Sequence, residues 1–290
     1  MLVLSHWRNS GTPEALRDDS SAQIVFKYLT RPDHHVFVEG VTNNHFDADG
    51  LVGLFSILNP QEARPQRKFL EDVAAAGDFA ICEDRDAAHV SFVIDAWLDP
   101  VRSPLNQTVF KAPYGEFTNI LYEELLPRFA QIVEKIDRFE KFWIDQEELL
   151  AESEEKFEKK RFRLEEYPEI DLAVVTMPDS NLTPSQSIHQ MAIHNRTNCL
   201  RILLLQENKY ELYFRYESWV DFWSRKTMPR IDLNDLAATL TKQESMDGVW
   251  THDDIEAITA TLKLEGAPLS LVPADSFKQQ VIQYLTDRKE

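Results

Sequence analysis

In the first 115 residues, short apolar runs typical of buried strands alternate with segments whose apolar residues recur at helical spacing. The strand-like runs lie at 2–4 and 36–38, and the second is β-branched and aromatic, as a buried strand should be. Helical spacing predicts helices over 20–29, 51–58, 61–76 and 86–97. Such alternation indicates an α/β domain over 1–115, with helices on both faces of a parallel sheet.

The middle of the chain carries one long helical pattern. From 116 to 166, apolar residues such as Leu121, Leu125 and Phe129 recur at spacings of three and four, and charged residues then dominate. We therefore predict a helical connector over 116–166.

The last part of the chain, 167–290, has the pattern of a smaller α+β domain. Strands are predicted at 171–177, 200–205 and 210–216, the last two forming a hairpin. The pair Thr183-Pro184 predicts a helix start, because Thr caps helices and Pro suits their first turn. Further helices are expected over 234–241, from 251 onward and after Pro273.

Composition is that of an ordinary globular protein. The chain has 290 residues, of which 43% are hydrophobic and 28% charged, and no apolar run approaches a membrane span. The start lacks the basic region of a signal peptide, and Cys82 and Cys199 lie far apart in apolar contexts. We expect a cytoplasmic protein without membrane contact, with thiols rather than a disulfide or a cysteine-based zinc site.

Charge narrows the range of ligands. The formal net charge of −18 argues against binding long nucleic acid, which relies on a basic surface. It leaves room for a small phosphorylated ligand, because a metal and a few arginines can reverse the field locally. With only 8 glycines and no Gly-rich phosphate loop, nucleotide chemistry would have to use metal and side chains.

The candidate chemistry lies between the predicted strand at 36–38 and the following helix. Here His45, Asp47 and Asp49 stand on alternate residues, so their side chains point the same way in an extended loop. An imidazole and two carboxylates at the carboxyl end of a strand suit a hard divalent cation. The alternative without a binding site is a solvated loop in which Asp49-Gly50 forms a turn.

The sequence His45-Phe-Asp47-Ala-Asp49-Gly50, placed after a strand and before a helix, resembles the first motif of the DHH phosphoesterase superfamily. This resemblance implies Mn²⁺ as the cofactor, with Mg²⁺ as the second choice, and catalytic roles for His45, Asp47 and Asp49. It also implies two domains joined by a helical linker. No Asp-His-His triplet follows the motif, and the one at 33–35 precedes it. The number of bound ions, one or two, and whether the protein hydrolyses a substrate at all therefore remain open questions.

Further metal ligands are expected from Asp78 at a helix end and Asp84 at a helix start. The alternative for Asp84 is a helix N-cap. His6, which follows the first predicted strand, could approach the His45 loop or lie at the surface. Asp86 and His89 share one helix face and are weaker candidates.

Substrate contacts are expected in the last domain. The Gly-rich, His-containing motif of the superfamily is absent there, and the polar side chains in its neighbourhood suit a phosphate. They are His189, His194, Asn195, Arg201 and Arg215. The alternative is an exposed Arg215 and a helix-terminal His194 favoured by the helix dipole.

Together these features predict a metal-dependent phosphoesterase that hydrolyses a short oligonucleotide, dinucleotide or nucleotide in an interdomain cleft. A non-nucleotide phosphoester fits the sequence equally well. The alternative is a catalytically degenerate relative that binds a phosphorylated ligand or a protein partner. A homodimer is left open.

Overall fold

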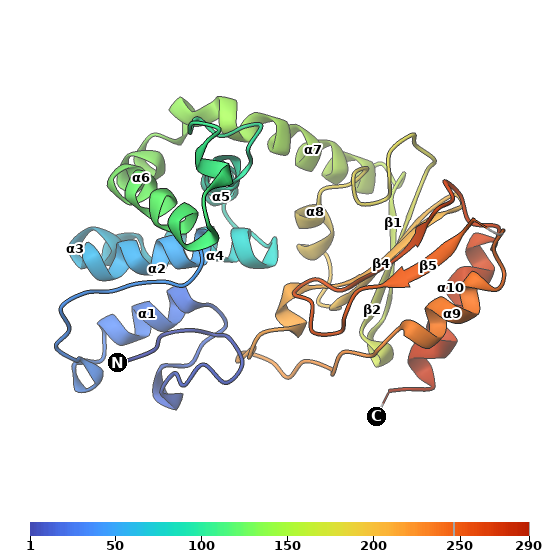
Figure 1. Ribbon diagram of the computed structural model, residues 1–290, viewed down its shortest axis with the longest axis horizontal. Helices are drawn as coiled ribbons and strands as arrows, with labels where there is room; N and C mark the ends of the chain where they lie inside the picture. Colours follow the sequence, from blue (N-terminus) through green and yellow to red (C-terminus); the bar gives the residue numbers. More distant parts are fainter. Residues whose placement is uncertain (246, 290) are drawn as a thin grey trace. The chain divides into compact units, whose positions relative to one another are not determined.

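The computed structural model describes residues 1–245 and 247–289, and it shows a mixed α/β protein of two compact units (Figure 1). The first, here called the helical unit, comprises Met1–Glu148 together with Asp221–Arg225. The second, the sheet unit, comprises Leu149–Val220 and the chain from Lys226 onward. The chain thus returns to the helical unit for a few residues within its last third.

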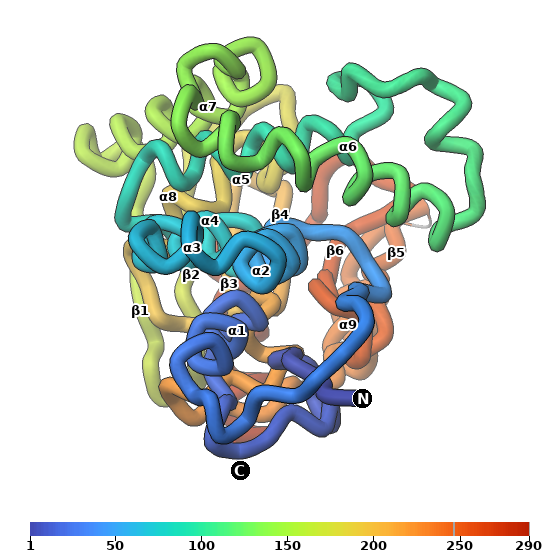
Figure 2. The backbone as a smooth tube through the Cα atoms, turned by 90° about the vertical axis from the view of Figure 1, so that its left-hand side faces the viewer, coloured from blue at the N-terminus to red at the C-terminus, as the bar shows by residue number. Residues whose placement is uncertain are grey.

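Helices pack in pairs in the helical unit. Its helices are α1 (Ser21–Leu29), α2 (Ala48–Leu58), α3 (Pro60–Ala63), α4 (Arg67–Phe79), α5 (Arg85–Leu98), α6 (Tyr114–Glu134) and the first half of α7 (Glu140–Glu158). Helix α2 contacts both α1 and α4, and α4 also packs on α5. The path of the backbone through these helices is drawn as a tube in Figure 2. Fully buried Leu51, Leu70 and Val93 from these helices form part of its core.

The parallel sheet expected over 1–115 is absent from the described residues, since every strand lies at Arg163 or later. Val36 and Val38 are about half exposed and Phe37 almost fully so, at 46%, 48% and 99%. Segment 2–4, together with Val36 and Val38, lines one cavity, and the two segments do not pair with each other. A three-residue apolar run gives few ladder hydrogen bonds, and without a partner strand it remains a loop.

The sheet unit contains one mixed sheet, with six strands among the described residues in the order β1-β2-β3-β4-β6-β5. The strands are β1 (Arg163–Tyr167), β2 (Leu172–Met177), β3 (Arg201–Gln206), β4 (Lys209–Phe214), β5 (Val249–His252) and β6 (Thr261–Glu265). Among the strand pairs of the described residues, only β2–β3 is parallel, and α8 (Gln190–His194) lies in the connection between these two strands.

Both faces of this sheet are covered because its central strands are apolar on both sides. Leu172 and Leu203 join a core with Phe277 of α10 (Ala274–Thr286), to which α9 (Asn234–Thr241) also contributes. Ala173 and the alternate residues of β2 and β3 join a second core with Ile193 of α8. Continuous apolar strands of this kind are what a sheet buried on both faces requires.

Local signals located three of the six described strands and the last two helices of the sheet unit; strand β6 was not predicted, and three further predictions differ from the structure. Strand β2, the β3–β4 hairpin, α9 and α10 lie where they were predicted. The helix predicted from Thr251 is wrong, because Thr251 pairs with Lys263 in the sheet. The helix expected from Thr183 is replaced by turns before the short α8, and the connector helix ends at Glu158 before β1.

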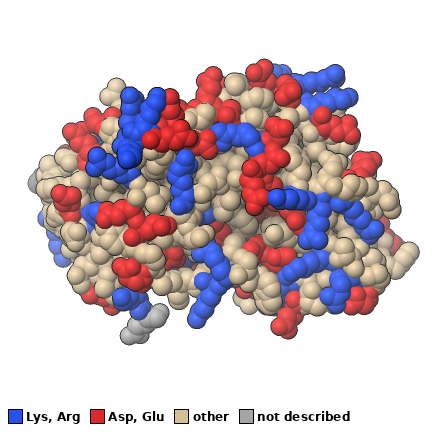
Figure 3. Space-filling model, turned by 180° about the vertical axis from the view of Figure 1, so that it is seen from behind, with Lys and Arg blue, Asp and Glu red and all other residues tan. Residues whose placement is uncertain are grey.

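Within the described part of the chain, no helix combines the length and the apolar character that crossing a membrane requires. Acidic and basic side chains are interspersed over the face that Figure 3 shows.

Candidate metal centre

Three buried side chains from distant parts of the helical unit converge on one point. His6, Asp49 and Asp78 each offer a ligand atom, and these atoms all lie within 4.8 Å of one another. His6 Nδ1 is 3.3 Å from Asp49 Oδ2, and His6 Nε2 is 3.7 Å from Asp78 Oδ2. We call these three residues the His6 cluster. The structure thus brings together two predicted ligands, Asp49 and Asp78. It adds His6, for which the sequence allowed either a position near the His45 loop or one at the surface.

Asp49 connects this cluster to two helix N-termini. It lies in the first turn of α2, and its two carboxylate oxygens accept the backbone N–H groups of Ser21 (2.8 Å) and Ala22 (2.7 Å) at the start of α1. Burial would raise its pKa, but His6 and these N–H groups outweigh burial and hold the pKa below its ordinary value. Asp49 is therefore a carboxylate at neutral pH, the form that binds a cation.

A glycine brings Asp78 into the cluster. Asp78 is in the last turn of α4, and a Cβ built on the preceding Gly77 would lie 2.4 Å from Ala48 Cβ. Without a side chain at Gly77, α4 can approach the start of α2 closely. The helix then ends in a left-handed residue, Ala80, with φ of 50°.

The motif loop forms a hydrogen-bonded pair beside the cluster. His45 Nε2 lies 2.7 Å from Asp47 Oδ2, while Asp47 Oδ1 accepts the N–H of Gly50 at 2.6 Å and caps α2. Burial lowers the pKa of His45, but Asp47 and Asp49 raise it more, so the net direction is upward. His45 and Asp47 are thus held as an acid–base pair and are not members of the His6 cluster.

Aromatic side chains fix this loop from two sides. The Trp7 ring stacks on His45 with centroids 4.7 Å apart. Tyr122 of α6 donates its hydroxyl to the His45 carbonyl at 2.9 Å and accepts from Asn43 at 3.0 Å. Gly50 is needed here, because a Cβ would lie 2.2 Å from Asn43 Nδ2 and 2.6 Å from the Tyr122 hydroxyl. Gly50 is therefore a packing glycine inside α2, not the turn residue of the alternative interpretation.

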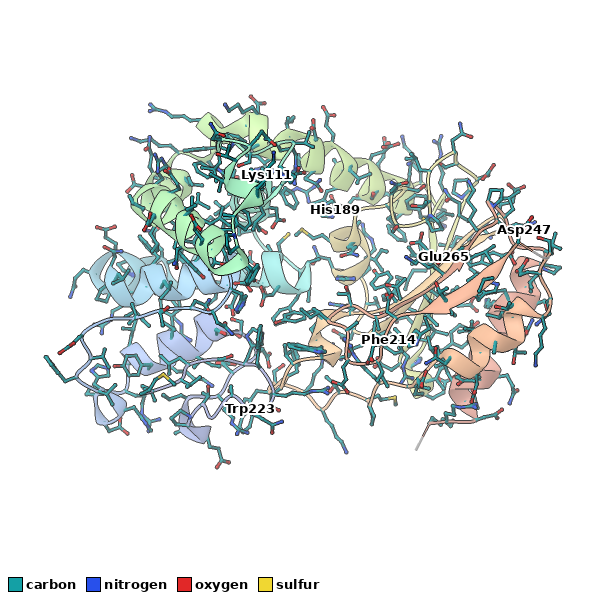
Figure 4. The ribbon with its side chains drawn as sticks, viewed as in Figure 1. Lys111, His189, Phe214, Trp223, Asp247 and Glu265 are labelled. Atoms are coloured by element: carbon teal, nitrogen blue, oxygen red, sulfur yellow. The ribbon has the colours of Figure 1, made fainter. Side chains whose placement is uncertain are left out.

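A short segment of the last third of the chain, Asp221–Arg225, packs on the helical unit next to His6, and we call it the strap. The Asp221 N–H donates to the His6 carbonyl at 2.9 Å. The Phe222 ring meets Phe79, the neighbour of Asp78, edge-on at 5.6 Å. Trp223, labelled in Figure 4, and Ser224 both donate their N–H groups to Asp19. The strap therefore supports the backbone on which the His6 cluster is built.

A cavity of about 540 Å³ opens beside the cluster. Asp49, His45 and Ser21 contribute to its wall, and so do apolar residues of the N-terminal segment, α1 and α2. This volume lies in the range of small-molecule sites.

Asp84 lies outside the His6 cluster. Its side chain accepts the N–H of Asp86 at 2.9 Å and caps α5, which is the alternative considered for it from the sequence. His89 is bonded to Glu147 at 2.9 Å and stacks on Trp143 with centroids 3.9 Å apart, so it joins α5 to α7.

The two arginines predicted to contact substrate are buried in the sheet unit. Arg215 is 1% exposed, pairs with Glu217 and donates to the Thr197 carbonyl at 2.9 Å. Arg201 is 3% exposed and donates to the carbonyls of Ile170 and Pro229. The solvent-facing position considered for Arg215 is thus wrong, because the residue follows β4 and turns its guanidinium into the interior.

The polar residues around α8 also make contacts within the protein. His189, labelled in Figure 4, caps α8 by accepting the N–H of Met191 at 3.1 Å. His194 Nε2 is 3.0 Å from the Tyr213 hydroxyl, and both side chains are buried. Asn195 ends the helix and is exposed.

One further acidic residue near the motif loop was not expected. Asp95 of α5 is exposed as a whole residue, yet burial of its carboxyl group raises its pKa to about 6, with Arg102 opposing and Asp47 adding to the rise. In the sequence it is one acidic residue in an amphipathic helix, and nothing there signals that it faces Asp47.

A family model described as a family of unknown function (DUF6687) matches residues 1–290. None of the curated proteins compared with this sequence matches it. Function therefore has to be inferred from the side chains described above.

Proposed function

The chain thus belongs to DUF6687, a family of unknown function, and we propose that it is a metal-dependent phosphoesterase acting on a small phosphorylated substrate. The observation that carries this proposal is the His6 cluster, whose ligand atoms come from three distant segments and lie within 4.8 Å of one another. The cavity beside it offers room for a substrate.

The donor set fits the cation that the motif suggests. One imidazole nitrogen and two carboxylates suit Mn²⁺, whereas Mg²⁺ prefers oxygen ligands in near-ideal octahedral geometry. Asp49 keeps its negative charge at neutral pH, and each carboxylate oxygen can accept a hydrogen bond and still offer a lone pair. His6, Asp49 and Asp78 would hold the ion.

When bound, the ion would supply charge to the phosphoryl oxygens and make a bound water more acidic. The side chains of the protein itself would position the substrate and transfer protons. The His45–Asp47 pair lies next to Asp49. Asp47 orients the imidazole through Nε2, and Asn44 Oδ1 lies 2.7 Å from Nδ1, so a proton would pass through Nδ1 once a substrate displaces the Asn44 side chain. Trp7 holds this pair in place by stacking on the His45 ring, and Tyr122 does so by donating to the His45 carbonyl.

The alternative is a relative that binds a phosphorylated ligand or a protein partner without catalysis. It is favoured by the hydrogen bonds of Asp49, both of whose oxygens already accept N–H groups of α1. It is also favoured by Arg201 and Arg215, which are used within the protein.

A matched pair of substitutions tests the proposal. Asp78→Asn removes a charge from the cluster without changing its shape, and Asp84→Asn removes the charge of an acidic residue that caps α5 outside it. We expect Asp78→Asn to lower Mn²⁺ affinity and Mn²⁺-stimulated hydrolysis at least about a hundredfold, as loss of a charged ligand should. Asp84→Asn should leave both within about threefold.

Mn²⁺ binding is measured by calorimetry, and hydrolysis with a linear 5′-phosphorylated dinucleotide and with p-nitrophenyl phosphate. If wild type binds Mn²⁺ but hydrolyses neither substrate, the binding alternative replaces catalysis. If wild type takes up no Mn²⁺, or if Asp78→Asn binds it as well as wild type does, the metal centre is refuted.

A further inference from the structure

The cavity beside the His6 cluster is polar at one end and apolar at the other. Helices α1 and α2 both contribute to its wall and both begin at the cluster, since Asp49 in the first turn of α2 accepts the first N–H groups of α1. Cavity-lining residues therefore run outward along each helix from this common start.

The gradient can be followed along the two helices. On α1 the lining changes from Ser21 to Tyr28, and on α2 from Asp49 to Ile57. At 1.5 Å per residue these spans are roughly 10 and 12 Å long. The cavity is thus about as long as an eight-carbon chain, with its polar end at the cluster.

The far end consists of apolar side chains that remain partly open to solvent. Leu54 and Ile57 of α2 are only half-buried, and Val36 and Val38, which also line the cavity, are 46% and 48% exposed. Exposed apolar surface of this kind on a concave wall is costly in water and marks ligand grooves.

We propose that this cavity binds the aliphatic part of an amphiphilic phosphoester, with the phosphoryl group at the His6 cluster. This assignment of substrate class rests on the proposed function. The negative charges of Asp47, Asp49 and Asp78 repel a phosphate unless a cation lies between them. Arg8 also lines the cavity, but its single positive charge does not offset three carboxylates, so the headgroup needs the metal at the cluster, whereas the tail needs only the cavity.

An aliphatic tail fits the far end better than a nucleobase does. A base would need several hydrogen-bond partners for its edge, whereas Val25, Val36, Leu54 and Ile57 offer none and Tyr28 offers only its hydroxyl, which already accepts the Val36 N–H at 3.5 Å. An alkyl chain needs none, and each methylene that leaves water gains roughly 0.8 kcal/mol.

Calorimetric titrations with three probes separate headgroup from tail. Octyl phosphate, ethyl phosphate and octanol are each titrated with Mn²⁺ and with EDTA. With Mn²⁺ we expect octyl phosphate to bind at least about a hundredfold more tightly than ethyl phosphate, a conservative share of the six extra methylenes. Octanol should bind equally with Mn²⁺ and with EDTA.

Two tryptophan substitutions on α2 provide the matched control. Leu54→Trp places a large ring in the cavity, whereas Leu58→Trp adds the same ring at a position that is 55% exposed and does not line the cavity. Leu54→Trp should weaken octanol and octyl phosphate at least about tenfold, and Leu58→Trp should leave both unchanged. Circular dichroism confirms that each variant is folded.

The outcomes distinguish this inference from the proposed function. If octanol binds and Leu54→Trp blocks it while Mn²⁺ has no effect on any probe, the tail site stands and the metal centre fails. If Mn²⁺-dependent hydrolysis occurs with equal affinity for ethyl and octyl phosphate, the metal centre stands and the tail site is refuted. Octanol binding that Leu54→Trp leaves intact also refutes it.

Discussion

At the scale of single residues, the candidate centre depends on two glycines as much as on its ligands. Gly50 leaves room for Asn43 and Tyr122 against the start of α2, and Gly77 leaves room for Ala48 against the end of α4. Neither has a left-handed φ, so their value lies in close approach and not in backbone freedom. The final glycine of the motif is thus explained by packing.

Gly50→Ala should therefore be damaging. The new methyl group would lie 2.2 Å from Asn43 Nδ2 and 2.6 Å from the Tyr122 hydroxyl, so these two side chains, which are hydrogen-bonded to each other and through Tyr122 to the motif loop, have to shift. We expect a loss of about 2 kcal/mol of unfolding free energy, typical of overpacking, and at least about tenfold weaker Mn²⁺ binding. Thermal denaturation and calorimetry measure the two effects.

Gly53→Ala is the control on the same helix, because its Cβ would meet Val25 at an ordinary 3.7 Å. It should be neutral or slightly stabilising, since Ala favours a helix. Equal effects of the two substitutions would show that close packing at Gly50 is not what matters.

A second residue-scale prediction concerns Asp95, whose pKa is raised from 3.8 to about 6. A raised pKa means that protonated Asp95 stabilises the fold fully below pH 3.8, and that this contribution is lost as pH rises through about 6. Asp95→Asn mimics the protonated form. Its melting temperature should therefore exceed that of wild type by about 2–4 °C near pH 7.5, a value discounted for partial exposure, and by little near pH 4.

The matched control is Asp99→Asn at the end of the same helix. Its pKa is lowered by the Val101 N–H and by Arg102, so its contribution changes only as pH falls below its ordinary range. Between about pH 5 and 7.5 the melting difference for Asp99→Asn should stay constant. A pH-independent difference for Asp95→Asn would contradict the raised pKa.

At the scale of elements, the sequence predicted what local interactions determine. Helix α1 begins at the expected serine because Ser20 and Gln23 form a capping box, and the β3–β4 hairpin pairs residues close in sequence. The strands predicted at 2–4 and 36–38 failed because a strand requires a partner that no local pattern specifies. For the same reason Thr251 was assigned to a helix, although it pairs with Lys263 in the sheet.

In the candidate centre, too, residues close in sequence were predicted to lie together, whereas contacts between distant residues depended on the fold. His45, Asp47 and Asp49 were recognised together because they lie in one motif. Asp78 and Asp84 looked equivalent in sequence, and only the packing of α4 against α2 separates the cluster member from the helix cap. His6 lies more than forty residues from Asp49, and its membership depends on the fold of the N-terminal segment.

The strap gives a prediction at this scale. Asp19 accepts the N–H groups of Trp223 (2.7 Å) and Ser224 (2.6 Å), so Asp19→Ala leaves the strap without this anchor. We expect proteolytic cleavage within 221–228 to become about tenfold faster, because released loops are preferred cleavage sites. Asp18→Ala removes a neighbouring carboxylate that pairs with Lys27 and should leave cleavage unchanged. Equal rates for wild type and Asp19→Ala would refute the anchoring.

At the scale of the whole molecule, a net charge of −18 attracts cations everywhere on the surface. Weak binding of Mn²⁺ to exposed carboxylates is therefore expected whether or not a centre exists. The His6 cluster differs because its side chains are at most 4% exposed, and buried charges are screened by salt much less than exposed ones.

Salt should therefore separate the two kinds of binding. In about 0.5 M NaCl, exposed carboxylates are screened beyond a few ångströms, and Mn²⁺ should bind only at the cluster. At a hundredfold excess over its dissociation constant, Mn²⁺ should then still stabilise wild type by about 2.7 kcal/mol. Asp78→Asn should lose this stabilisation, and Asp86→Asn, an exposed position, should keep it. Stabilisation that vanishes in salt for wild type would mean that Mn²⁺ binds only to the acidic surface.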